Sequence, residues 1–124
     1  WGLPPRSCAL ELDVSRAIES SPEVRPAPDF SSHPIAKEDI ALVVAGDVSA
    51  RDVAASIERG AGELLESLSL FDVYEGDQVP DGHKSVAFAL RFRAPDRTLS
   101  AEELAGIREA IVESTAADVG ARLR

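Results

Sequence analysis

Two neighbouring stretches of the sequence carry side chains that could together recognise a flat, polar ligand. In the first, Asp72 and Tyr74 alternate with apolar residues, so they share one face if the stretch is a strand. In the second, Ser85, Arg91 and Arg93 fall on the polar side of an alternating pattern. A carboxylate can accept hydrogen bonds from the N1–H and the exocyclic amine of guanine, an aromatic ring can stack on an unstacked base, and guanidinium groups can hold phosphates. These residue types point to recognition of a nucleotide.

Lys84 adds a third cation beside Ser85 that could hold a phosphate. Ala87 and Ala89 lie between the polar residues and leave room for a flat ligand. The alternative is an ordinary protein surface, in which Tyr74 packs on the following loop and Asp72 caps that loop. The residue types alone leave both interpretations open.

These side chains share a surface only if two strands pair. The sequence predicts strands over 64–74 and 85–93, joined by turn residues over 75–82 into a long antiparallel hairpin. Phe71 and Val73 are the expected core residues of the first strand. The apolar face of the second strand consists of Val86, Phe88, Leu90 and Phe92.

The remaining elements complete a recognisable order. A continuous apolar run predicts a central strand over 40–44, and Ser49 is placed to cap a helix that Gly60 and Gly62 would end. A capping-box pattern over 100–103 starts a second helix that runs to about residue 118, and 121–124 predicts a final edge strand. The order β-α-β-β-α-β predicts an α+β, ferredoxin-like fold, in which two helices cover one face of a four-stranded antiparallel sheet and leave the other face open.

Residues 1–32 have a different character from the rest. Alternating apolar residues predict a strand over 8–14, followed by a helical turn over 15–19 and a proline-rich extended linker over 20–28. Because a lone strand cannot satisfy its own edges, we interpret 1–32 as an arm left from a preceding domain plus a linker, and 33–124 as the domain itself. The alternative is that this strand pairs with the main sheet. The chain contains no methionine, which also favours a piece of a longer protein.

Composition limits the possible chemistry. The chain of 124 residues has 13 Lys and Arg against 22 Asp and Glu, a net charge of −9, which argues against a generally basic nucleic-acid coat but not against a local site. Its single cysteine, Cys8, excludes an internal disulfide and a thiolate metal site, and neither His33 nor His83 has a metal-ligand companion. No phosphate-binding glycine loop or nucleophile–base arrangement is present, so an independent enzyme has almost no support from the residues. No apolar run is long enough for a transmembrane helix.

Several ordered strings resemble one family. They are Leu-Phe-Asp-Val-Tyr-Glu-Gly over 70–76, Val-Pro-Asp-Gly-His-Lys-Ser-Val-Ala-Phe over 79–88, Phe-Arg over 92–93 and Arg-Thr-Leu-Ser-Ala-Glu-Glu over 97–103. Together they resemble the C-terminal ferredoxin-fold anticodon-binding domain of the bacterial phenylalanyl-tRNA synthetase beta subunit, over roughly 33–124. The first six residues also resemble the region just upstream in that subunit. The chain departs from the family pattern at Glu38, where a basic residue usually precedes the aspartate.

The resemblance implies a role for the chain and for its parent enzyme. The parent would join phenylalanine to its tRNA with ATP and Mg²⁺, in the cytoplasm, as an α2β2 assembly whose active site lies in the alpha subunit. This domain would hold the anticodon stem-loop of tRNA(Phe), with Asp72, Tyr74 and Ser85 on the first anticodon base, a guanine. The chain itself would hold no catalytic residue, metal or cofactor. The alternative function is a protein-interaction domain that docks another subunit without touching RNA, which requires an exposed apolar patch.

Overall fold

The described residues of the first part of the chain include a short helix. The computed structural model describes residues 2, 4, 7–21 and 31–124, and the chain divides into two compact units, Trp1–Phe30 and Ser31–Arg124. In the first unit, helix α1 spans Val14–Glu19, and the Asp13 side chain accepts a hydrogen bond from the Arg16 N–H at its start. The predicted helical turn over 15–19 is confirmed. The predicted linker lies outside the described residues from residue 22 onward.

The strand predicted over 8–14 is wrong. Residues 7–13 have no regular secondary structure, and Leu10 and Leu12 are exposed. Alternation of apolar residues makes a strand only where a neighbouring strand supplies hydrogen bonds, and the described residues 7–21 contain no strand that could do so. Asp13 and Val14 belong instead to the start of α1.

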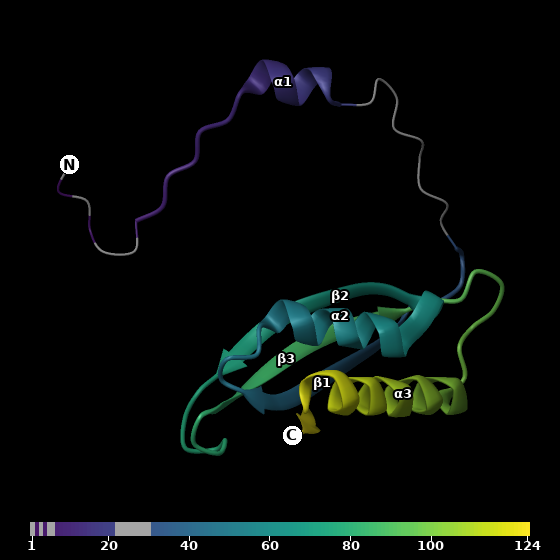
Figure 1. The fold of residues 1–124 in the computed structure, drawn as a ribbon. Coiled ribbons are helices and arrows are strands. Elements are labelled where there is room, and N and C mark those ends of the chain that lie inside the picture. The colour runs from purple at the N-terminus through teal and green to yellow at the C-terminus, as the bar shows by residue number, and fades with distance from the viewer. Residues whose placement is uncertain (1, 3, 5–6, 22–30) are drawn as a thin grey trace. The chain divides into compact units, whose positions relative to one another are not determined.

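The second unit is a sheet covered by two helices. Strand order in the sheet is β2-β3-β1-β4, and every pairing is antiparallel. In Figure 1, α2 and α3 lie against the same side of this sheet. The arrangement confirms the α+β, ferredoxin-like prediction. The elements are β1 (Ala36–Ala45), α2 (Ala50–Ala61), the 3₁₀ turn η1 (Gly62–Leu64), β2 (Leu65–Tyr74), β3 (His83–Phe92), α3 (Ala101–Val119) and β4 (Arg122–Leu123).

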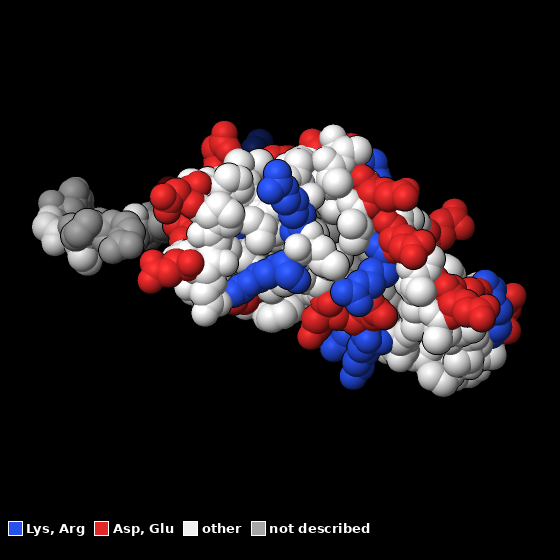
Figure 2. Space-filling model, turned by 90° about the horizontal axis from the view of Figure 1, so that it is seen from below, with Lys and Arg blue, Asp and Glu red and all other residues white. Residues whose placement is uncertain are grey.

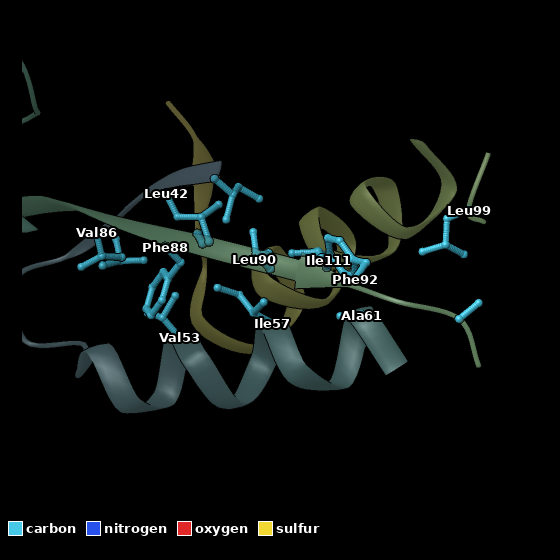
Figure 3. Close-up of a cluster of buried hydrophobic side chains, with 14 residues drawn as sticks. Leu42, Val53, Ile57, Ala61, Val86, Phe88, Leu90, Phe92, Leu99 and Ile111 are labelled. Carbon is cyan, nitrogen blue, oxygen red and sulfur yellow. The ribbon is translucent and has the colours of Figure 1, made fainter. Parts of the chain in front are cut away.

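The core lies between the sheet and the helices. Alternate residues of β3 are buried, as the sequence pattern predicts, and Val53 and Ile57 of α2 point toward them in Figure 3. Ile111 adds the contribution of α3. Burial of these apolar side chains fixes which face of the sheet α2 and α3 cover, so the opposite face, the open face, is not covered by these helices.

Local signals set the helix ends. Ser49 Oγ accepts a hydrogen bond from the Asp52 N–H at the start of α2. At the start of α3, Ser100 and Glu103 form the reciprocal capping box. Gly120 follows α3 in the left-handed conformation, with φ of 64°. The predicted helix boundaries at Ser49, Ser100 and Gly120 are therefore confirmed.

Strand β2 departs from regular alternation. Leu70 pairs with Phe88 and Asp72 pairs with Ala87, so Phe71 is an extra residue in a β-bulge. Phe71 is 58% exposed and Val73 is 48% exposed, so their prediction as core residues is wrong. The bulge interrupts the alternation of the two faces. In addition, β2 lies at the edge of the sheet and has a neighbouring strand, β3, on one side only.

Gly60 lies inside α2 rather than ending it. Gly62 is the residue at the C-cap, as predicted for one of the two glycines. A β-carbon at Gly60 would lie 2.7 Å from the Ile111 Cα and 2.8 Å from the Ala110 carbonyl oxygen. Gly60 therefore lies where the backbone of α2 approaches that of α3 too closely for a β-carbon to fit.

Replacing Gly60 with alanine should destabilise the domain, because the new methyl group would force the two helix backbones apart. We expect Gly60→Ala to lower the free energy of unfolding by about 1–3 kcal/mol. Gly106→Ala is the matched control within α3, where a β-carbon has no neighbour within 4 Å. It should raise stability by about 0.5–1 kcal/mol through helix propensity. Urea unfolding measures both, and equal effects of the two variants would contradict the close approach.

The capping box should make stability depend on acidity. Hydrogen bonds from the Ser100 N–H and the Arg97 guanidinium hold the pKa of Glu103 at about 2, below its ordinary value of 4.5. Because the folded-state pKa is the lower one, this stabilisation is complete above pH 4.5 and is lost as the pH falls toward 2.

We expect Glu103→Gln to remove part of the loss of stability at low pH. The glutamine amide can still cap the helix, but it does not titrate and forms no ion pair with Arg97. Urea unfolding between pH 7 and pH 2 should show the wild type losing more stability than the variant. Glu102→Gln removes the same charge from the same turn and is the control. Parallel curves for the wild type and Glu103→Gln would refute the assignment.

Candidate nucleic-acid interface

Strand pairing brings three of the predicted site residues to one place. Tyr74 of β2 is opposite Ser85 of β3, and Asp72 is opposite Ala87, one pair further along the same face. Because directly opposed residues point to the same side of a sheet, all of these side chains belong to the open face. The bulge at Phe71 comes before them and does not disturb this register.

The neighbouring strand extends this part of the open face with small side chains. Ala41 of β1 is opposite Ala87, and Val43 is opposite Ser85. Ala41 and Ala87 are short and partly exposed, so they leave a shallow shelf beside the ring of Tyr74 and the carboxylate of Asp72. A planar aromatic ligand needs such a surface in order to lie against a ring and reach a polar group at once.

The Tyr74 side chain is held by its surroundings. A β-carbon at Gly76 would lie 2.6 Å from the Tyr74 hydroxyl oxygen, so the ring position requires a glycine there. The guanidinium carbon of Arg124 lies 5.3 Å from the centre of the ring, within cation–π range. Tyr74 is half-buried as a result.

Ser85 is not exposed, although the sequence places it on an accessible surface. Only 3% of the residue is accessible. Ser85 lies on β3, between Tyr74 of β2 and Val43 of β1. Both of these neighbouring side chains are larger than the serine side chain. The expectation of an exposed hydroxyl is therefore wrong for this conformation, while the juxtaposition of Ser85 with Asp72 and Tyr74 is as expected.

Asp72 offers a free acceptor. Its side chain is exposed, and within 31–124 it makes no ion pair or side-chain hydrogen bond. An ionised carboxylate has two oxygens and accepts hydrogen bonds only. It can therefore bind a ligand edge that presents two adjacent donors.

Lys84 is not brought together with these residues. It pairs with Val44, whose side chain is fully buried beneath the helices, so Lys84 belongs to the opposite side of β3 from Ser85. Its ammonium group donates a hydrogen bond to the Gly46 carbonyl oxygen at 2.8 Å.

The two arginines after Ser85 have different environments. Arg91 is exposed on the open face opposite Lys37, about 20 Å along the strand from Ser85 at about 3.3 Å per residue. Arg93 is only 19% exposed; its Nε lies 3.0 Å from Glu66 Oε1 and its Nη1 donates to the Ser31 carbonyl oxygen at 2.6 Å. Arg91 can meet a distant part of a long ligand, whereas Arg93 is occupied within the protein.

The sequence reasoning missed two residues at this site, Arg124 and Gln78. Arg124 Nη2 donates to Gln78 Oε1 at 2.5 Å, and the Arg124 N–H donates to the Ala41 carbonyl oxygen at 3.0 Å. A signal was available, because a strand over 121–124 puts Arg122 and Arg124 on one face. Which face this is depends on the pairing of Arg122 with Val43, which the sequence does not specify.

The chain is acidic overall, with a net charge of −9. On the face shown in Figure 2, Lys and Arg appear as separate groups among Asp and Glu. Within the described part of the chain, no cluster of three or more His, Cys, Asp or Glu side chains could hold a metal ion, and no helix is long and apolar enough to cross a membrane. A ligand at this site would therefore meet a few placed groups rather than a broad basic surface.

The fold and this site define a class of protein. The family model of the ferredoxin-fold anticodon binding domain matches residues 31–124, and the chain belongs to this family. Relatives include the phenylalanine–tRNA ligase beta subunits of Thermobifida fusca, Streptomyces avermitilis and Cutibacterium acnes, which are 52%, 50% and 48% identical over 124, 123 and 123 residues. The matches cover 100%, 99% and 99% of this chain but only 15% of each relative, so the chain spans a small part of their length.

The contacts of Arg93 predict that it stabilises the fold rather than binding RNA. We expect Arg93→Gln to lower the free energy of unfolding by about 1–2 kcal/mol, because it removes the ion pair with Glu66 and the hydrogen bond to the Ser31 carbonyl oxygen. Arg91→Gln, the matched control on the same strand, should change it by less than about 0.5 kcal/mol. An unchanged stability in Arg93→Gln together with weaker RNA binding would show the opposite role.

Proposed function

We propose that this chain binds the anticodon stem-loop of tRNA(Phe), as part of a longer phenylalanine–tRNA ligase beta subunit. The observation that carries the proposal is the grouping of Asp72 and Tyr74 beside a shelf of small side chains on the open face, in a chain of this domain family. The grouping follows from strand register and does not use the resemblance, which selects the same residues.

The chemistry of the group favours guanine. Tyr74 supplies a ring on which an unstacked base can lie, and the Asp72 carboxylate can accept from the guanine N1–H and exocyclic amine together. Adenine has no N1–H and no amine at the corresponding carbon, so it would leave the carboxylate unpaired, which is costly once water is excluded. Ser85 would join as a hydrogen-bond partner when the side chains around it move aside.

Contacts with the RNA backbone would come from other residues of the open face. Arg91 and Lys37 face each other at the far end of the strands and are both exposed, so they can meet phosphates of the stem. With a net charge of −9, the chain should bind weakly and lose affinity steeply with salt. Further contacts of the parent protein would supply the remaining affinity.

The reaction of the parent protein would take place outside this chain. In this proposal, aminoacylation with phenylalanine, using ATP and Mg²⁺, occurs in the alpha subunit of an α2β2 assembly. The chain would contribute the contact that positions the anticodon end of the tRNA. Residues 1–32 would be the arm that connects it to the preceding domain.

One observation favours a second function, docking of another protein surface. Leu70, Phe71 and Val73 are large apolar residues, all exposed, on the edge strand β2. Unpaired edge strands with exposed apolar side chains are typical places for contact with another chain. RNA binding by the open face and protein contact at the β2 edge use different surfaces and can coexist.

Binding of a phenylalanine-type anticodon stem-loop at low salt tests the proposed function. The wild-type chain should prefer the loop with guanine at the first anticodon position over the same loop with adenine there. Tyr74→Ala should weaken binding by about 1–3 kcal/mol, which is roughly 5- to 150-fold in Kd, because the stack is lost.

Asp72→Asn should remove about 1–3 kcal/mol of the discrimination between the two loops. Asp39→Asn is its control, since Asp39 is also exposed on the open face but lies opposite Ala89, away from Tyr74. Equal effects of the two substitutions would mean that only net charge matters. Absence of binding to either loop would favour the docking function instead.

A further inference from the structure

The ring that should accept a base already has a partner in the free protein. The Arg124 guanidinium carbon lies 5.3 Å from the centre of the Tyr74 ring, and its Nη2 is fixed on Gln78 Oε1. Arg124 belongs to the end of the chain beyond β4, at the opposite edge of the sheet from β2. Its side chain therefore reaches from the β4 edge toward the β2 edge and meets Tyr74 over the open face.

The backbone of Arg124 is anchored by strand pairing, whereas its side chain is exposed and held by surface contacts. The Arg124 N–H donates to the Ala41 carbonyl oxygen at 3.0 Å, which extends the pairing of β4 with β1 by one residue. Within 31–124, the guanidinium is held only by an exposed hydrogen bond and the ring. Motion of the side chain thus leaves the strand pairing intact and keeps the group within reach of the shelf.

The relative strengths of the two contacts decide what occurs when a base arrives. A cation–π contact at an exposed site is weaker than a stack between a base and an aromatic ring, so a base can displace the guanidinium from Tyr74. A displaced guanidinium is a planar cation, and guanidinium planes stack on bases as aromatic rings do. The anchored backbone holds it on the side of the base away from Tyr74.

We propose that Arg124 is a base-binding residue of this site and forms the second wall of a slot whose first wall is Tyr74. In the free protein the two walls contact each other, and the guanidinium takes the place of the base. When RNA binds, the base enters between the ring and the guanidinium, and its Watson–Crick edge faces Asp72. The proposal rests on the proposed anticodon-binding function and adds a residue to it.

Substitution at Arg124 separates stacking from charge. Arg124→Gln should weaken binding of the guanine-containing stem-loop by about tenfold at low salt, because one of the two stacking surfaces is lost. Arg124→Lys keeps the charge but not the plane, and most of the loss should remain. Arg108→Gln, at an exposed position on α3, removes the same charge away from the open face and should bind like the wild type.

The free protein offers an independent readout. Tyr74 is the only tyrosine of the chain, so selective labelling gives NMR signals from this one ring. Arg124→Gln should shift those signals in the absence of RNA, and Arg108→Gln should not. Unchanged ring signals in Arg124→Gln would overturn the proposal at its starting contact.

The outcomes distinguish this inference from the function on which it rests. In one outcome, the wild type prefers guanine and Tyr74→Ala weakens binding, while Arg124→Gln binds as well as the wild type or more tightly. Arg124 then does not stack on the base, and the inference fails while the proposed function stands. Wild-type affinity in Arg124→Lys would reduce the role of Arg124 to its charge and also overturn the inference. If the wild type binds neither loop, both the function and the inference fail.

Discussion

Burial of one face of β3 is the constraint on which the rest of the structure depends. Val86, Phe88, Leu90 and Phe92 are packed against α2 and α3, and this fixes the direction of every other side chain on the strand. A slip of one residue would bring Ser85 and Arg91 into the core and expose four large apolar groups, so the register is strongly specified. Because β3 pairs with both β1 and β2, its register also sets theirs.

The candidate site is a consequence of that register on the side that the helices do not cover. Asp72 and Tyr74 on β2 gain their neighbours Ala87 and Ser85 through pairing with β3, and Ala41 joins through β1. The site needs no cavity, since small side chains leave a flat area and a ring stands at its edge. A flat base with hydrogen-bonding groups at its rim suits this geometry better than a compact ligand does.

An acidic chain can carry such a site because the interactions are local. The proposed stacking and hydrogen bonds at Tyr74 and Asp72 would act over a few ångströms, whereas repulsion from exposed carboxylates elsewhere is screened over about 10 Å at ordinary salt. Negative charge therefore costs association rate and general affinity more than it costs recognition of one base. Arg124 fits this pattern, since its guanidinium is placed by a strand and a side-chain hydrogen bond rather than by a basic surface.

The sequence by itself determined the order of the elements, both helix starts and the face on which Asp72, Tyr74 and Ser85 lie, because periodicity and capping are local properties of the chain. The prediction from sequence was wrong at residues 8–14, where the structure has no strand, and at Phe71 and Val73, where a bulge and an edge position override the pattern. Only the tertiary structure decided that Ser85 is covered, that Lys84 and Arg93 are occupied within the protein, and that Arg124 meets Tyr74. Each of these depends on which segments lie side by side across the sheet, and contacts between residues as far apart as 74 and 124 are set by strand pairing, not by local sequence.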